Sequence, residues 1–202
     1  SSPNGIDAIY EPRVLFYLPG PNDAAFAKGG INRSAHFAGD RLSARVNGLT
    51  GENYTVALWF WSGTAKGVVD GTEWIASRGM NYGGKDVGDH IGIREIESGE
   101  RIFTFTCPGG PRDLPATTRV ERWKWYQLVL VRKGETVDVH LDGALLASLD
   151  AKSVASPSPD TFFFGGSCTG EGNFEGRLDE IAVFDRALSR DEIATLYQEN
   201  QP

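Results

Sequence analysis

Short segments in which apolar residues alternate with polar ones recur along the chain, and turn-forming residues separate them. The strongest is 54–61 (YTVALWFW), in which even-numbered positions share one face and odd-numbered positions, including Trp59 and Trp61, share the other. Both faces are largely apolar, so we expect this strand to lie centrally in its sheet. Alternation with a period of two is typical of β-strands, and its regular interruption by turns is typical of an antiparallel sandwich.

The remaining alternating segments predict an all-β chain with about a dozen strands. One helix is expected over Arg190–Glu199, because Ser189 and Glu192 have the spacing of a capping box. With 202 residues, 25 Gly and 10 Pro, the chain is predicted to form a single domain over its whole length. We expect strands over 13–18, 34–37, 41–46, 54–61, 74–78, 90–97, 101–107, 125–132, 136–141, 144–149, 161–164 and 177–184.

The charge of the chain argues against a nucleic-acid partner. There are 20 Lys and Arg residues against 27 Asp and Glu, which gives a formal net charge of −7, and no basic block to contact phosphates. No apolar run approaches the roughly 20 residues of a membrane span. The chain begins at Ser1 without a leader, and we expect it to be a mature or excised piece of a longer protein.

Four segments in this order resemble the bacterial LamG-like (laminin G-like) jelly-roll domains. They are SAHFAGDRLSARV at 34–46, YTVALWFW at 54–61, WYQLVLVRKGETVDVHLDG at 125–143 and FEGRLDEIAVFDRALSRDEIATLYQ at 174–198. The resemblance implies the fold of the concanavalin A-like lectin/glucanase superfamily, a two-sheet antiparallel β-sandwich with one short C-terminal helix. This fold agrees with the strand pattern, although the segment 8–30 matches the family poorly.

The resemblance also implies a structural calcium ion. Asp179 matches a position where many LamG-like domains place a calcium ligand, and the turn at Gly39-Asp40 matches the other side of that site. Calcium needs six or more oxygen ligands, and the sequence offers two candidates. The alternatives are a salt bridge or a turn hydrogen bond for Asp179, and a solvated turn for Asp40.

Aromatic residues are the candidates for ligand binding. A flat exposed indole can stack on the apolar face of a sugar while neighbouring polar groups bind the sugar hydroxyls. We therefore predict a non-catalytic, carbohydrate-binding module of an extracellular, cell-surface or periplasmic protein. The alternative for each aromatic residue is a place in the core. The candidate ligand-binding residues are Trp59, Trp61, Tyr82, Trp123 and Trp125.

Two other functions stay open: a protein-interaction or spacer domain of a larger secreted enzyme, and a β-glucanase-like glycoside hydrolase. The hydrolase would use Glu95 and Glu100, whose segment is a broken version of the motif Glu-x-Asp-x-(x)-Glu. Retaining enzymes hold two carboxyl groups about 5–5.5 Å apart. Here Glu97 replaces the Asp, and Ser98-Gly99 is predicted to turn the chain. We therefore expect no catalysis.

The chain has two cysteines, Cys107 and Cys168, and each follows an apolar segment and precedes a glycine-containing loop. Two cysteines are too few for a disulfide scaffold or a four-thiolate zinc site. They could form one disulfide in an oxidising compartment, or they could be two buried thiols. The sequence leaves both alternatives open.

Overall fold

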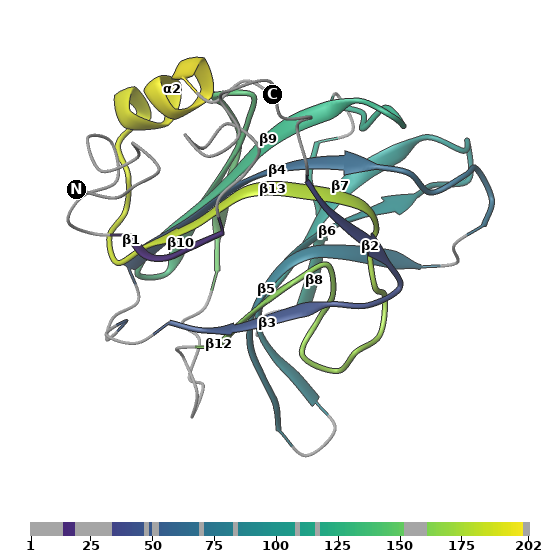
Figure 1. The fold of residues 1–202 in the computed structure, drawn as a ribbon, viewed down its shortest axis with the longest axis horizontal. Coiled ribbons are helices and arrows are strands. Elements are labelled where there is room, and N and C mark those ends of the chain that lie inside the picture. The colour runs from purple at the N-terminus through teal and green to yellow at the C-terminus, as the bar shows by residue number, and fades with distance from the viewer. Residues whose placement is uncertain are drawn as a thin grey trace, which may run out of the picture.

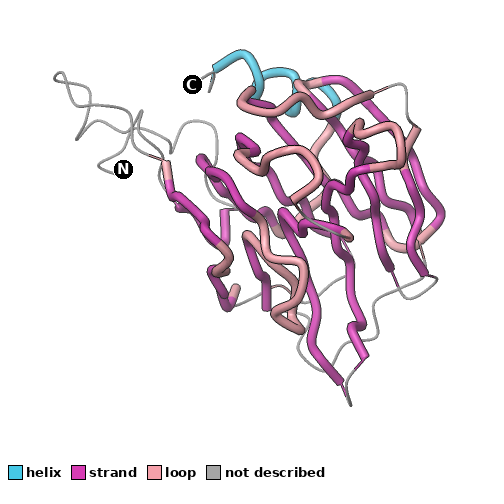
Figure 2. Tube along the Cα trace, turned by 90° about the vertical axis from the view of Figure 1, so that its right-hand side faces the viewer, coloured by secondary structure: helices cyan, strands magenta, loops and turns pink. Residues whose placement is uncertain are grey.

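The computed structural model describes residues 14–18, 34–46, 49, 53–68, 71–82, 85–107, 110–115, 118–151 and 161–199. Within these residues, thirteen strands form two antiparallel sheets that pack face to face, and one helix lies outside them (Figures 1 and 2). The predicted two-sheet sandwich with a short helix near the C-terminus is confirmed.

The larger sheet, called sheet A, has seven strands. Its strand order is β1 (Val14–Leu18), β13 (Glu175–Phe184), β4 (Asn53–Ser62), β9 (Trp125–Lys133), β10 (Thr136–Leu141) and β11 (Ala144–Asp150), and β2 (Ala35–Ala38) also pairs with β13. Sheet B has six strands, in the order β3 (Leu42–Arg45), β12 (Thr161–Phe164), β5 (Thr72–Tyr82), β6 (Lys85–Glu95), β7 (Arg101–Cys107) and β8 (Gly110–Asp113). As predicted, β4 lies in the interior of its sheet, between β13 and β9.

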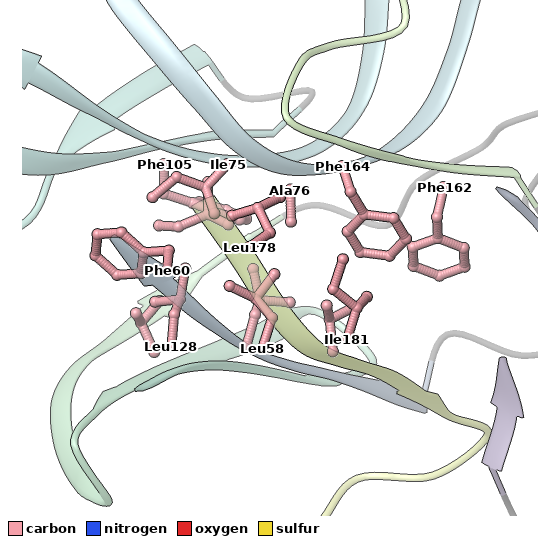
Figure 3. Packing of buried hydrophobic residues seen from close by; sticks show 14 of the residues in the cluster. Leu58, Phe60, Ile75, Ala76, Phe105, Leu128, Phe162, Phe164, Leu178 and Ile181 are labelled. Atoms are coloured by element: carbon pink, nitrogen blue, oxygen red, sulfur yellow. The ribbon is translucent and has the colours of Figure 1, made fainter. Parts of the chain in front are cut away.

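The core lies between the sheets, and the alternation of β4 decides which side chains enter it. Leu58 and Phe60 of sheet A point toward Phe105 and Phe164 of sheet B (Figure 3). The ring of Phe60 meets that of Phe103 edge-on at 5.9 Å between centroids. Because burial of a large apolar side chain contributes about 1.5–3 kcal/mol, this double layer is the main stabilising feature of the fold.

Strand β8 is the one described strand that the sequence did not predict. Its sequence, GPRD, contains Gly and Pro and lacks the alternation of a half-buried strand. The strand pairs only with β7 and forms an edge of sheet B. An edge position tolerates proline, because one side of the strand needs no ladder hydrogen bonds.

The helix α2 (Arg190–Glu199) lies on the outer face of sheet A, the face turned away from sheet B (Figure 1). Its predicted capping box forms: the amide of Glu192 donates to Ser189 Oγ at 3.3 Å, and the amide of Ser189 donates to Glu192 Oε2 at 2.8 Å. Ile193 and Leu196 are buried against the sheet. Within the described residues, no helix combines the length and apolar character needed to cross a membrane.

Candidate binding site at the Trp123 end

Trp123 lies at the end of the sandwich where β4 ends and β9 begins. Its side chain is 64% exposed, which is unusual for a residue of this size. Its backbone has φ of 62°, and its amide donates to the carbonyl of Ser62 at 2.9 Å. A bulky residue in the left-handed region is a true outlier, and such conformations persist where surrounding contacts enforce them, often at functional sites.

An open hollow of about 420 Å³ lies beside Trp123. It is bounded by the turn between β6 and β7, the start of β7, and the segment that leads into β9. The turn forms as predicted, since the amide of Ile96 donates to the carbonyl of Glu100 at 2.8 Å. The lining residues are Gly99, Glu100, Arg101, Arg119, Val120, Glu121, Arg122 and Trp123.

Ion pairs surround this hollow. Arg122 pairs with Glu95, and its Nε donates to the carbonyl of Thr64 at 2.9 Å, which ties the segment before β9 to the loop after β4. Arg119 pairs with Glu100, which also lines the hollow, and both side chains are partly exposed. Each guanidinium still has donors that its carboxylate partner does not use, because it carries five N–H groups.

Below the hollow, a buried network holds the backbone of Trp123 in place. Arg101 is 2% exposed and pairs with Glu73, and it also donates to Ser62 Oγ. Thr64 Oγ donates to the same carboxylate. Burial lowers the pKa of Arg101, and the charge of Glu73 opposes this shift. Ser62 therefore links the network to Trp123: its hydroxyl accepts from Arg101, and its carbonyl accepts from the amide of Trp123.

Trp61 and Trp125, two of the predicted ligand residues, lie together near this end. They face each other directly across β4 and β9, and both are partly exposed. Their neighbours Phe60 and Tyr126 stack in the core, so the two indoles lie on the outer face of sheet A. The guanidinium of Arg177 lies 5.3 Å from the ring centroid of Trp61.

Trp59 is placed differently from Trp61, although both share one face of β4. It is 4% exposed and stacks on Tyr197 of α2, with 5.7 Å between ring centroids and 23° between planes. The expectation that Trp59 offers a stacking surface is therefore corrected, because the helix covers its indole. Tyr82 ends β5, and its side chain lies outside the described residues.

Asp40 and Asp179, the predicted calcium ligands, do not lie together. Ala38 of β2 pairs with Glu175 of β13. From this pair, Asp40 lies two residues farther along the chain in one direction, and Asp179 lies four residues along β13, about 13 Å, in the opposite direction. The described residues contain no group of three or more His, Cys, Asp or Glu that could hold a metal ion. The two carboxylates do not fit one shared ion, and calcium binding stays a prediction.

Asp179 is a buried carboxyl at a bulge of β13. It is 5% exposed, and its Oδ1 accepts a hydrogen bond from the amide of Glu180 at 3.0 Å. Burial raises its pKa to about 7, since desolvation disfavours the charged form. Of the two alternatives to calcium that the sequence allowed, the local hydrogen bond is present.

The two cysteines are thiols and are not joined by a disulfide. Cys107 ends β7 and packs in the core, and Cys168 is buried in the loop after β12. Of the alternatives left open by the sequence, the structure has the pair of buried thiols.

Sequence reasoning missed the charged residues that shape the site, chiefly Glu73, Arg101, Arg119 and Arg122. Glu73 and Arg101 are 28 positions apart and meet because β5 and β7 flank β6 in sheet B. The signal that existed was weak: both residues lie in the first two positions of a strand, and only β7 is otherwise largely apolar. The sequence alone does not predict which charged residues from different strands of a sheet form ion pairs.

The chain matches known proteins at the level of family and fold. The family model described as the concanavalin A-like lectin/glucanases superfamily matches residues 37–194. The chain has no match among curated protein sequences.

Three solved structures share the fold. Domain 4 of AbnA, an extracellular GH43 arabinanase from Geobacillus stearothermophilus solved with arabinotriose, has a TM-score of 0.59 at 19% identity, covering 85% of this chain and 80% of that one. A native heptameric SAP-like pentraxin from Limulus polyphemus has a TM-score of 0.57 at 14% identity, covering 72% and 70%. A leech intramolecular trans-sialidase has a TM-score of 0.64 at 20% identity, covering 95% of this chain but 29% of the enzyme.

Proposed function

Because the chain belongs to the concanavalin A-like lectin/glucanase superfamily, we propose that it is a non-catalytic carbohydrate-binding module whose site is the Trp123 end of the sandwich. The observation that carries the proposal is Trp123 itself: an indole 64% exposed, on a left-handed backbone that a buried network holds in place. A large apolar ring in solvent on a strained backbone does not stabilise the fold, and strained positions of this kind cluster at binding and active sites.

Binding would use the indole face and the charged groups beside it. The C–H face of a sugar ring stacks on Trp123, and its hydroxyls bond to free donors and acceptors of Arg119 and Glu100 at the hollow. Trp61 and Trp125 lie near the same end and offer a second, partly exposed aromatic surface on which a longer oligosaccharide could stack.

The contacts of Glu95 and Glu100, the two carboxylates that a hydrolase would use, favour a non-catalytic function. Glu95 pairs with Arg122, and Glu100 pairs with Arg119, so each is held by a different arginine. The turn at Ser98-Gly99 also places Glu100 at the tip of the hairpin, opposite Ile96, whereas Glu95 pairs with Arg101, so the two carboxylates do not follow one another along one strand. Two carboxylates engaged in this way are poorly suited to act together on one glycosidic bond.

The fold neighbours are consistent with this function. Domain 4 of the extracellular arabinanase was solved with arabinotriose, and the structural match covers most of both chains. By this analogy the chain is a module of a secreted or surface protein that brings a partner domain to a polysaccharide. The analogy is one of fold, and the site must be tested on its own residues.

Affinity electrophoresis in gels that contain arabinan, xylan, galactan or laminarin tests the proposal. We expect retardation in at least one gel and a loss of affinity of at least about tenfold for Trp123→Ala. Leu145→Ala is the matched control, since Leu145 is also a large exposed apolar residue, 40% exposed on β11. The proposal fails if no polysaccharide retards the protein, or if Trp123→Ala migrates like the control.

A protein-interaction role is the second candidate, and Val68 favours it. Val68 is 64% exposed and lies in the loop after β4, which reaches the same end, since the amide of Gly67 donates to Glu95 Oε2 at 3.3 Å. Two large apolar side chains exposed near one end of a domain suit a protein partner. Val68→Ser separates the candidates, because it would weaken a protein contact and leave glycan retention unchanged.

A further inference from the structure

Each charged side chain that lines the hollow beside Trp123 is already engaged in an ion pair. The lining holds three arginines and two glutamates, and their partners come from the surrounding strands and turn. Four cations thus face four carboxylates, and the set is electrically neutral. The pairs are Arg101 with Glu73, Arg119 with Glu100, Arg122 with Glu95, and Lys124 with Glu121.

The burial of these pairs limits what an acidic ligand could use. The Arg101 side chain is 2% exposed and that of Arg122 is 16% exposed, so both are committed to the protein. Arg119 is 61% exposed, but its guanidinium is already held by Glu100. A sugar carboxylate that approached Arg119 would have to displace Glu100 and leave a like charge beside itself, which is unfavourable.

An uncharged sugar meets no such cost. A hydroxyl group both donates and accepts, so it can bond to an unused N–H of an arginine and to an unused lone pair of its carboxylate partner while the ion pair stays intact. Charge-assisted hydrogen bonds of this kind are stronger than neutral ones. The paired side chains of the lining therefore offer donors and acceptors without a net charge, while Lys66, whose ammonium lies against Gly99, adds one positive charge next to them.

We infer that the Trp123 site selects neutral sugars and discriminates against uronic acids and other acidic glycans. This inference rests on the proposed carbohydrate-binding function and adds the class of ligand to it. The indole supplies the stacking surface, and the paired charges supply hydrogen bonds that a neutral pyranose or furanose ring can use. The net charge of −7 on the whole chain acts in the same direction, since it repels anions at low salt.

The test uses oligosaccharides in matched forms: uronic-acid oligomers from several polysaccharides, and the same oligomers after reduction of each carboxylate to a neutral hydroxymethyl group. Immobilised on one array, the neutral members should bind at least about fivefold more tightly than their acidic counterparts. Binding of the neutral members should change by less than about twofold between low salt and about 0.5 M NaCl, because no net charge is neutralised.

A pair of variants sharpens the test. Glu100→Gln releases Arg119 from its partner, so the affinity for the acidic members should rise by about two- to fivefold, as expected for an exposed charge pair. Arg119→Gln, the matched control, should leave the acidic members weakly bound. Both side chains are partly exposed, and circular dichroism can verify that the variants fold.

The outcomes separate this inference from the function on which it rests. If the wild type prefers acidic members and Trp123→Ala abolishes that binding, the site binds carbohydrate and the inference about neutral sugars is overturned. If no member binds in either form, the inference is overturned, and the polysaccharide gels decide separately whether the proposed function stands. A neutral preference that Trp123→Ala removes, with the gain for Glu100→Gln, supports both.

Discussion

The two ends of the sandwich bury the same kind of ion pair and differ in what surrounds it. At the open end, Arg101 and Glu73 lie beneath the hollow and Trp123. At the closed end, Arg132 and Asp89 pair at the opposite end of β4, with each side chain 1% exposed. Tyr54 and Ser62, which contact the two pairs, are eight residues apart on β4, about 26 Å at the rise of a strand.

Aromatic rings seal the closed end. The hydroxyl of Tyr54 donates to Asp89 Oδ2 at 2.6 Å, and the guanidinium of Arg78 lies 4.4 Å from the Tyr54 ring centroid. The rings of Tyr54 and Phe162 meet edge-on at 5.7 Å. A cavity of about 10 Å³ remains there, which is room for at most one water molecule.

The comparison teaches that a buried ion pair alone does not mark a functional site. Both pairs remove charges from water and require good geometry in return. The open end differs because its network continues outward, through Ser62, to a strained and exposed indole. The ion pair at the closed end stabilises the fold, whereas the ion pair at the open end stabilises the fold and also holds the exposed surface of Trp123 in place.

Breaking the closed end should have the largest effect on stability. Arg132→Met leaves the buried Asp89 without its guanidinium partner, so the free energy of unfolding should fall by about 3–5 kcal/mol. Urea denaturation measures this change. Glycan retention of the folded fraction should not change, because the closed end lies far from Trp123.

Arg94→Met is the matched control for that experiment. Arg94 pairs with Asp113 on the surface, with the side chains 36% and 42% exposed, so its removal should cost less than about 1 kcal/mol. Equal losses for the two variants would mean that the closed end is not the stabilising element described above.

Breaking the open end should cost both stability and binding. Arg101→Met leaves Glu73 buried, but that carboxylate keeps hydrogen bonds from Thr64 Oγ and from the amide of Glu175. We therefore expect a loss of about 3 kcal/mol, at the lower end for a broken buried pair. Unlike Arg132→Met, it should also weaken glycan retention, since it removes the support of Ser62 beneath Trp123. Unchanged retention would contradict the link between the network and the surface.

The sequence predicted the elements of the fold because the signals for them are local. The alternation of β4, the turn at Ser98-Gly99 and the capping box of Ser189 and Glu192 each lie within a few residues, and each is confirmed. Strand β8 was missed because GPRD carries no alternation.

The site was less predictable because its contacts are not local. Trp59 and Trp61 share one face of β4, and only the position of α2 separates them, by stacking Tyr197 on Trp59. The partners of Arg101 and Arg132 lie 28 and 43 positions away on other strands. Pairing of this kind depends on strand order and register across the whole sandwich, which no short segment encodes.

High pH should distinguish the ends through a tyrosine at each. Burial and the charge of Asp89 hold the pKa of Tyr54 well above its usual value, about 10, so the folded chain keeps this proton where the unfolded chain loses it. Stability is therefore full below pH 10 and should fall above it by up to about 1.4 kcal/mol per pH unit from this group.

The slope of unfolding free energy against pH, not its value, is the readout for Tyr54. Tyr54→Phe removes a hydrogen bond to Asp89 and so lowers stability at every pH, but it should flatten the decline above pH 10. Tyr126→Phe is the control at the open end, where burial raises the tyrosine pKa and the amide of Glu121 and the charge of Lys124 oppose the shift. A slope that changes equally in both variants would remove this distinction between the ends.

The smallest effect tests the strain at Trp123. Alanine is normally more stable than glycine outside special backbone positions, but at φ of 62° the order should reverse, because glycine adopts this conformation without a steric penalty. Trp123→Gly should therefore unfold with about 1 kcal/mol more free energy than Trp123→Ala, and both should lose glycan retention. Position 121 is the control, because Glu121 is exposed and is not among the described residues with positive φ. There Glu121→Ala should be more stable than Glu121→Gly. If alanine is favoured at both positions, the backbone of Trp123 is not strained, and exposure alone would distinguish the open end from the closed one.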